Sequence, residues 1–221
     1  MCHRAGRSRG RFLQVLHPTV ARDSAEDPNA HVLVCRSEDR RARRLTCGHT
    51  RCVSVPFPEP TEPASSSTEA IIRYLDYFRD QVASRVEGLS ETEQRTSRLP
   101  SAWTPVQLLK HLTHVEQRWL EWGFEGAAVA DPWADSRDGR WFVDDSEPLT
   151  DLLVAFREQA TRSNAVIEAH ALSDVGQPGP RWDGQPPATL ERVLLHLVQE
   201  YARHLGHLDI VAELAGGPTG E

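Results

Sequence analysis

The segment HLVQEYARHLGH, residues 196–207, places three histidines and one glutamate within twelve residues. Imidazole and carboxylate groups are common ligands of zinc, nickel and iron. Glu200 and His204 are four residues apart, a spacing that puts both on one face of a helix, where they can hold one ion. On a wheel of about 100° per residue, His204 lies inside the apolar stripe, Glu200 at its edge, and His196 and His207 nearer its margin. The pattern predicts that Glu200 and His204 point toward the protein interior.

The segment WTPVQLLKHLTHVEQRWL, residues 103–120, supplies a third candidate ligand. His111 borders the apolar stripe of this predicted helix, whereas His114 is turned about 60° away from it. A carboxylate beside apolar residues, such as Glu200, is costly unless a cation or hydrogen-bond donors compensate its charge. Two imidazoles and one carboxylate leave positions open for water or substrate, as in catalytic zinc sites. We therefore predict a metal site formed by His111, Glu200 and His204.

The residues alone leave alternatives open. A buried histidine is often only a hydrogen-bonded core residue, and Glu200 could instead form an ion pair with Arg203 or Arg192. His196 or His207 could replace Glu200 as a ligand. The ligand types also do not distinguish zinc from nickel or ferrous iron.

Helical elements must position these side chains, and apolar residues at helical spacing indicate four long ones. Thr104, Pro105 and Gln107 form a capping signature at the start of the second, and Ser90 with Glu93 suggests one short additional turn. No segment shows a convincing strand pattern. The sequence predicts an all-α four-helix bundle, a fold that places metal sites in its core. The four predicted helices span about residues 68–88, 105–122, 149–172 and 189–215.

Composition divides the chain near residue 68. Residues 1–68 contain all four cysteines and carry a formal charge of +4, whereas residues 69–221 contain no cysteine and carry −11. We expect 1–68 to be a poorly ordered extension or an over-called start, 69–215 to be the bundle and 216–221 to be a tail. A zinc site in the extension is not favoured, because its spacing matches no structural zinc pattern; its candidate ligands are Cys35, Cys47, His49 and Cys52.

The charge and hydropathy of the sequence also limit its partners. An acidic bundle argues against nucleic acid as a partner, because phosphate binding requires a basic surface. No apolar run approaches the roughly 18–20 residues that span a membrane, and no signal peptide is recognisable. We predict a cytoplasmic protein without a membrane partner. Any thiol chemistry in the bundle must use a thiol supplied from outside.

The segment around LLKHL, followed some ninety residues later by EYARHLGHLDIVAEL, resembles the DinB-like superfamily of four-helix metalloproteins. That superfamily includes the mycothiol-dependent maleylpyruvate isomerases and the YfiT-type proteins, and the sequence is most similar to an actinobacterial branch. The resemblance covers residues 69–215. It implies one divalent metal ion, zinc in the first instance with nickel or iron as alternatives, held by His111, Glu200 and His204. It also implies a homodimer.

The resemblance further implies a function, namely a metal-dependent S-transferase that joins a low-molecular-weight thiol such as mycothiol to a small-molecule electrophile. In such an enzyme His207 or His114 would move protons, and Arg203 and Arg192 would meet anionic groups. The pocket would be walled by Trp119, Trp122, Trp133 and Trp141. Three alternatives stay open. They are a metal-dependent hydrolase, a non-catalytic metal-binding stress or sensor protein with four protein ligands, and a metal-free helical bundle.

Overall fold

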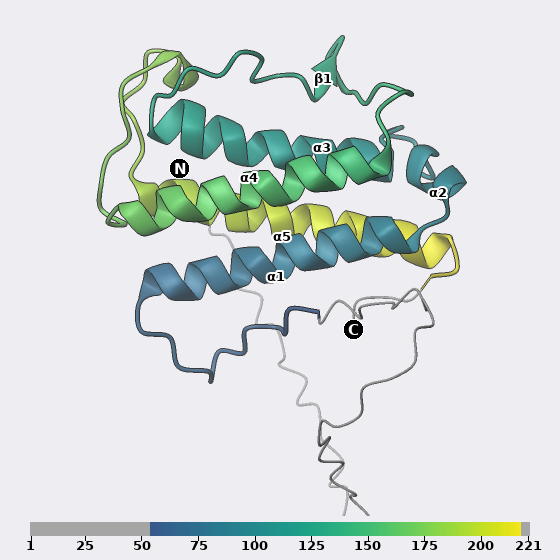
Figure 1. Cartoon of the computed structure of the whole chain (residues 1–221), viewed down its shortest axis with the longest axis horizontal. Coiled ribbons are helices and arrows are strands. Elements are labelled where there is room, and N and C mark those ends of the chain that lie inside the picture. Colours follow the sequence, from purple (N-terminus) through teal and green to yellow (C-terminus); the bar gives the residue numbers. More distant parts are fainter. Residues whose placement is uncertain (1–53, 218–221) are drawn as a thin grey trace, which may run out of the picture. The chain divides into compact units, whose positions relative to one another are not determined.

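Four long helices, packed side by side, form the fold of residues 54–217, the part of the chain that the computed structural model describes (Figure 1). The predicted four-helix bundle is therefore confirmed, and each predicted helix agrees closely in position with an observed one. The long helices are α1 (Ser67–Gly88), α3 (Pro105–Glu116, continued by the π-helix η1, Gln117–Phe124), α4 (Leu149–Ala169) and α5 (Leu190–Leu214); the shorter helical segments are α2 (Glu91–Arg95) and the 3-10 turn η2 (Pro180–Trp182).

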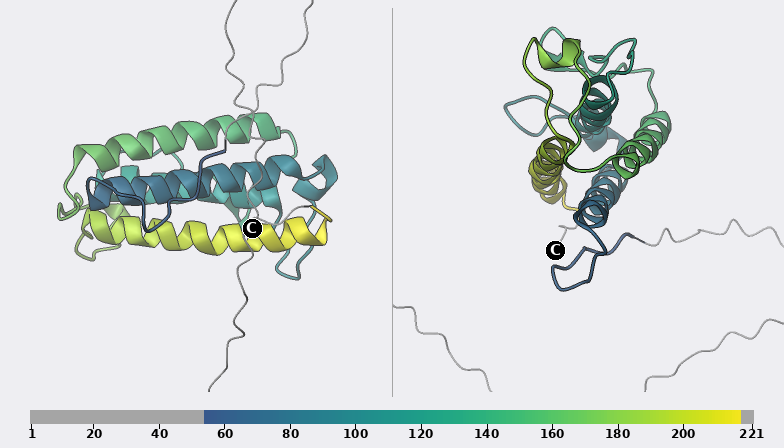
Figure 2. Two further views of the ribbon diagram at one scale, coloured as in Figure 1. Left: turned by 90° about the horizontal axis from the view of Figure 1, so that it is seen from below. Right: turned by 90° about the vertical axis from the view of Figure 1, so that its left-hand side faces the viewer.

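Among the long helices, α1 and α3 are consecutive in the chain, separated only by the short α2. They lie at opposite corners of the bundle, with α4 and α5 between them (Figure 2, right panel). Each of α1 and α3 packs against both α4 and α5. The arrangement makes α3 and α5, which carry the candidate ligands, direct neighbours. Leucine, isoleucine and valine side chains from all four helices fill the core, among them Leu75, Val82, Leu108, Leu112, Leu153, Ile167, Leu197 and Leu208.

Side-chain caps mark where α2 and α3 begin. The Ser90 hydroxyl accepts a hydrogen bond from the backbone N–H of Glu93 at the start of α2. At the start of α3, Thr104 and Gln107 form a complete capping box, with Pro105 in the first turn. Each such bond satisfies a backbone group that the first helical turn leaves without a partner. The predicted box of Thr104 and Gln107 is thus confirmed, and so is the short helix after Ser90. The Glu93 side chain, however, accepts from Arg98 and does not complete a box with Ser90.

The predicted helix at 105–122 differs from the observed one in its second half. From Gln117 to Phe124 the chain continues as a π-helix, whose wider turns close hydrogen bonds five residues apart. Gly123 suits this segment, because a Cβ there would lie only 3.0 Å from the carbonyl oxygen of Arg118. A wheel drawn for an α-helix consequently gives wrong directions for side chains after Gln117.

A small β-hairpin lies in the connection between η1 and α4, so the expectation of no strand was wrong at this point. Its strands, β1 (Ser136–Arg137) and β2 (Arg140–Trp141), have two residues each and pair in antiparallel fashion. Asp138 and Gly139 join them with φ values of 53° and 73°. Two left-handed residues are the geometry of a tight hairpin turn, and the Asp-Gly pair is its usual sequence. The strands are too short to show alternation.

Two glycines provide a matched test of this geometry. Gly139 needs a left-handed φ of 73°, so Gly139→Ala is expected to lower the free energy of unfolding by about 1–2 kcal/mol. Gly206 is an exposed residue in the middle of α5, and no atom lies near the position that a Cβ would take. Gly206→Ala is therefore expected to raise the free energy of unfolding by about 0.5–1 kcal/mol. Urea denaturation followed by tryptophan fluorescence measures both. Changes of the same sign would contradict the assigned conformations.

The segment before α1 packs onto that helix. The backbone N–H of Val55 donates to the Asp80 carboxylate at 3.1 Å, and the ring of Phe57 meets that of Tyr77 edge-on at 5.2 Å. The predicted division of the chain at residue 68 stays a prediction. The candidate zinc ligands Cys35, Cys47, His49 and Cys52 lie outside the described residues.

In the part of the chain that the structure describes, no helix combines the length and the apolar character that crossing a lipid bilayer requires.

Candidate metal centre

Three predicted ligands meet between α3 and α5. The structure brings donor atoms of His111, Glu200 and His204 to within 4.8 Å of one another. Nε2 of His204 lies 3.2 Å from a carboxylate oxygen of Glu200, and the rings of His111 and His204 meet edge to face at 5.3 Å. His204 is buried and the other two are partly buried. Separations this short allow one ion to reach all three donors after small side-chain rotations.

A buried carboxylate from the hairpin connection orients His111. Asp135, immediately before β1, lies 2.9 Å from Nδ1 of His111. The guanidinium of Arg118 donates to both oxygens of Asp135, at 2.6 and 3.1 Å, and to the carbonyl of Pro132 at 2.9 Å. Because Asp135 accepts from Nδ1, the other ring nitrogen of His111, Nε2, is left as the metal-binding atom. Metal-binding histidines commonly have such a carboxylate partner.

The ionisation states suit metal binding. Burial alone would raise the pKa of Asp135, but hydrogen bonds from His111 and Arg118 hold it at about 2, so the carboxylate stays charged. Burial lowers the pKa of His111, although Asp135 opposes the shift, and the neutral imidazole is the form that binds a metal. A hydrogen bond with His204 lowers the pKa of Glu200, so this carboxylate is also ionised at neutral pH.

Aromatic side chains cover the side of the triad nearest the hairpin. The indole of Trp141, in β2, stacks on the His111 ring at 4.2 Å and meets the His204 ring at 5.3 Å. His207 lies beside the triad, with its Nδ1 3.4 Å from Nδ1 of His204 and its ring 6.0 Å from that of Trp103. His207 therefore lies next to one of the candidate ligands, and its role in proton transfer stays a prediction.

The opposite side of the triad is formed by His196 and Trp119. Nε2 of His196 lies 3.5 Å from a Glu200 oxygen, and its ring meets Trp119 at 4.7 Å. The guanidinium of Arg181 lies over the Trp119 ring at 3.8 Å. Among residues 54–217, the group of donors close enough to share an ion does not include His196. His196 therefore contacts Glu200 without belonging to the candidate ligands.

Other predicted site residues lie farther out. Arg203 and Arg192 are exposed, and the contacts of Glu200 are with histidines instead. Trp122 packs against Trp133 at 6.5 Å, in contact with the connection that holds Asp135. His114 is partly buried, its Nδ1 has no hydrogen-bond partner among the described residues, and burial lowers its pKa.

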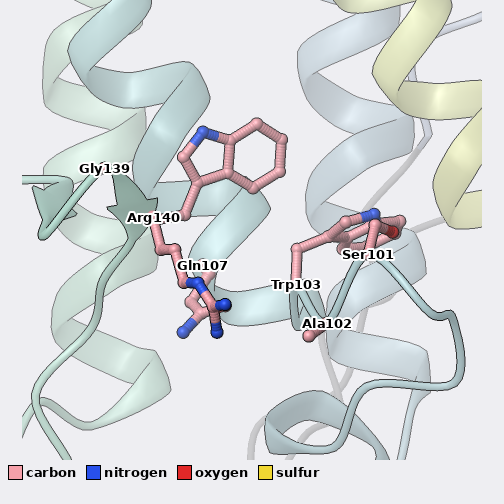
Figure 3. A pocket seen from close by; sticks show the side chains of 7 residues that line it. Ser101, Ala102, Trp103, Gln107, Gly139 and Arg140 are labelled. Atoms are coloured by element: carbon pink, nitrogen blue, oxygen red, sulfur yellow. The ribbon is translucent and has the colours of Figure 1, made fainter.

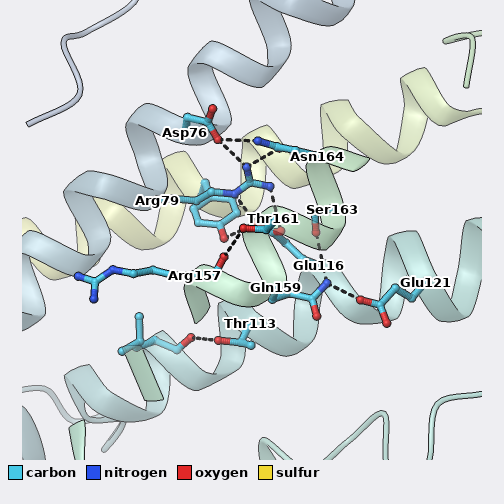
Figure 4. Close-up of polar contacts among 12 residues, drawn as sticks. Asp76, Arg79, Thr113, Glu116, Glu121, Arg157, Gln159, Thr161, Ser163 and Asn164 are labelled. Atoms are coloured by element: carbon cyan, nitrogen blue, oxygen red, sulfur yellow. Dashed lines mark hydrogen bonds and ion pairs between the residues drawn. The ribbon is translucent and has the colours of Figure 1, made fainter. Parts of the chain in front are cut away.

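A second polar network joins the four long helices (Figure 4). Arg79 of α1 donates to both oxygens of Glu116 of α3, at 2.8 and 2.9 Å. It also donates to Asn164 of α4 at 2.7 Å and to Asp76 at 2.8 Å. The hydroxyl of Tyr201, in α5 beside Glu200 in sequence, donates to the same Glu116. Burial and the negative charge of Glu116 raise the pKa of Tyr201, which stays protonated.

Sequence reasoning did not identify Asp135, Arg118, Arg79 or Glu116 as important residues. A signal existed for Arg79, which follows Leu75 by four residues inside an otherwise apolar stripe of α1, a place where an unpaired charge is not tolerated. No comparable signal existed for Asp135, because only the folded connection brings it to His111.

One protein-family model matches most of this chain. The family model described as MST, mycothiol S-transferase, matches residues 70–217, well over half of the 221-residue chain. The chain belongs to the mycothiol S-transferase family. The match includes all three candidate ligands and confirms the resemblance to DinB-like proteins seen in the sequence. The family implies a thiol as substrate.

The fold also has a solved counterpart. The chain is similar to YfiT from Bacillus subtilis, described as "a probable metal-dependent hydrolase with an unusual four-helix bundle topology". The TM-score is 0.50 at 16% identity, over 73% of this chain and 95% of that one. At this identity the similarity concerns the fold alone. No curated protein matches the sequence significantly.

Proposed function

We propose that this protein is a metal-dependent enzyme that joins the sulfur of mycothiol, or of a similar low-molecular-weight thiol, to a small-molecule electrophile. The observation that carries the proposal is the convergence of His111, Glu200 and His204 within 4.8 Å, in a chain of the mycothiol S-transferase family. Residues 69–221, the bundle and the tail, contain no cysteine, which fits a thiol that arrives as a substrate.

The donor set fits one divalent ion, with zinc as the first expectation and nickel or ferrous iron as alternatives. Neutral imidazoles and an ionised carboxylate are what such an ion requires, and the hydrogen bond that Nδ1 of His111 donates to Asp135 already fixes which nitrogen of His111 is available. When bound, the ion would lower the pKa of a thiol and so favour the nucleophilic thiolate at neutral pH.

The surrounding residues would then guide the reaction. His207 is the nearest further imidazole, 3.4 Å from His204, and we propose that it accepts the proton that the thiol loses. The sulfur forms a bond to the electrophilic carbon, and the leaving group departs with the bonding electrons. Trp141 and Trp119 flank the triad and restrict access of bulk water. Roles for His114, Arg203 and Trp122 stay predictions, as does the homodimer.

The function is tested with full-length protein purified without a histidine tag. Elemental analysis is expected to give about one equivalent of a divalent metal. The metal-loaded protein should accelerate the loss of mycothiol thiol groups in the presence of an alkyl halide, and prior treatment with a chelator should abolish the acceleration. Hydrolysis of an ester without any thiol requirement would favour the hydrolase alternative. Full activity after complete metal removal would contradict the proposal.

Asp135 provides a more local prediction. Asp135→Asn removes the charge that orients His111 and leaves Arg118 without its carboxylate, so metal affinity is expected to fall about 10–100-fold. Competition with a chromophoric chelator measures this directly. The matched control is Asp145→Asn, an exposed aspartate in the same connection, which should leave the affinity unchanged. Equal affinities for both variants would show that Asp135 has no such role.

A further inference from the structure

A cavity of about 370 Å³ lies beside the triad, between the start of α3 and the hairpin (Figure 3). Figure 3 shows the side chains of Gln107 and Arg140 on one side of the cavity and that of Trp103 on the other. The volume falls in the range of small-molecule binding sites. Its lining residues are Ser101, Ala102, Trp103, Gln107, Gly139, Arg140 and Trp141.

The cavity adjoins the metal centre through a shared wall. Trp141 lines the cavity and stacks on the ring of His111. Trp103 lines it as well and lies near His207. Gln107 precedes His111 by four residues, which is about 6 Å along the helix axis. The cavity and the triad are therefore neighbours, with the side chain of Trp141 between them.

The chemistry of the lining indicates what binds. Two tryptophans with ring centroids 6.2 Å apart and inclined by 56° offer broad aromatic faces. The polar groups are an amide, a hydroxyl and the exposed guanidinium of Arg140, and no carboxylate is among the described lining residues. Sugar rings match such surfaces, because their C–H bonds pack on the electron-rich aromatic face while their hydroxyls form hydrogen bonds at the edge.

Ala102 adds an independent observation. It lines the cavity with a φ of 64°, in the left-handed region that residues other than glycine rarely occupy. Such strain persists where the surrounding structure requires it, and it is common at binding sites. Here it sets the turn that leads into Trp103 and the capping box of α3.

We propose that this cavity binds the sugar portion of the thiol substrate, an inference that rests on the proposed function. Mycothiol joins one cysteine residue through an amide bond to a glucosamine–inositol unit. The sulfur and the sugar are therefore separated by roughly one residue's length, so the sugar must lie in a subsite that adjoins the triad. The cavity between Trp103 and Trp141 meets this requirement.

The test compares three molecules on metal-loaded full-length protein, namely mycothiol, N-acetylcysteine, which lacks the sugar, and N-acetylglucosaminyl-inositol, which lacks the sulfur. Trp103→Ala is expected to raise the KM for mycothiol about tenfold, a loss typical of one aromatic contact, with kcat and the KM for N-acetylcysteine unchanged. Trp103→Phe should restore most of the affinity. A raised KM for the electrophile instead would overturn the proposal and assign the cavity to that substrate.

A second variant guards against a folding defect in Trp103→Ala. Arg140→Ala alters an exposed hairpin residue that lines the cavity. It should raise the KM for mycothiol and leave the KM for N-acetylcysteine unchanged. Its control is Arg137→Ala, in which the lost side chain lies on Phe142 rather than in the cavity. Equal effects of Arg140→Ala on mycothiol and N-acetylcysteine would overturn the proposal.

Binding of the sulfur-free fragment separates this inference from the proposed function. Isothermal titration of the fragment requires no turnover, so binding that Trp103→Ala abolishes would support the subsite even in a protein without transferase activity. If the protein is an active transferase but Trp103→Ala binds the fragment as tightly as the wild type does, the proposed function is supported and the proposed sugar subsite is wrong.

Discussion

His204→Ala is expected to remove the bound metal and, with it, thiol transfer. His204 is buried on α5 and lies 3.2 Å from Glu200, so it is the most enclosed of the three donors. Four-ligand zinc sites hold their ion with about 10–16 kcal/mol, or roughly 3–4 kcal/mol for each ligand. Loss of one ligand should therefore weaken binding at least about 100-fold. Elemental analysis after dialysis and the thiol-loss assay measure the two effects.

The same helix offers matched controls for this result. His196→Ala and His207→Ala remove imidazoles near the triad that do not belong to the donor group among the described residues, and both should retain about one equivalent of metal. His207→Ala should slow transfer while it retains the metal, as expected for a proton acceptor. Metal retained by Glu200→Ala but lost from His196→Ala would contradict the assignment and make His196 a ligand.

Arg79→Met is expected to produce the largest loss of stability. Arg79 and Glu116 are 5% and 1% exposed, and their two hydrogen bonds compensate both charges. Burial alone would lower the pKa of Arg79, but the Glu116 carboxylate raises it, so the guanidinium stays charged. Removal of one partner from a buried pair leaves an uncompensated charge and costs about 3–5 kcal/mol. Guanidinium denaturation at neutral pH measures the change.

An exposed ion pair supplies the control. Arg157 lies 3.1 Å from Glu87, with both side chains near half exposed, and Arg157→Met should cost at most about 1 kcal/mol. The double variant Arg79→Met with Glu116→Met removes both buried charges and should recover much of the stability. An effect of Arg79→Met as small as that of Arg157→Met would show that the network contributes little.

The stability of this network bears on the metal centre. Tyr201 anchors α5 to Glu116 of α3, and it follows Glu200 directly in the chain. The contact fixes the rotation of α5 and thereby the direction in which Glu200 and His204 point. We expect variants of Arg79 that still fold to bind the metal less tightly, although none of the atoms involved contacts the ion.

Much of the fold and of the triad could be predicted from the sequence, because both depend on local periodicity. Apolar residues at helical spacing indicate four helices, and capping residues such as Thr104 mark where they begin. Glu200 and His204 share a face through their spacing alone, and the apolar stripe shows which face is buried. The inward direction predicted for His111 agrees with the structure because α3 is still a regular α-helix at that position.

The tertiary structure alone decided what surrounds the triad. Asp135 and Trp141 reach His111 only because the connection after η1 folds back over α3 through a tight Asp-Gly turn. The π-helix redirects Trp119 and Trp122, which no regular wheel anticipates. Periodicity describes one helix at a time, whereas these contacts join segments distant in the chain. Their positions depend on loop geometry and packing, so the local pattern of residues does not contain them.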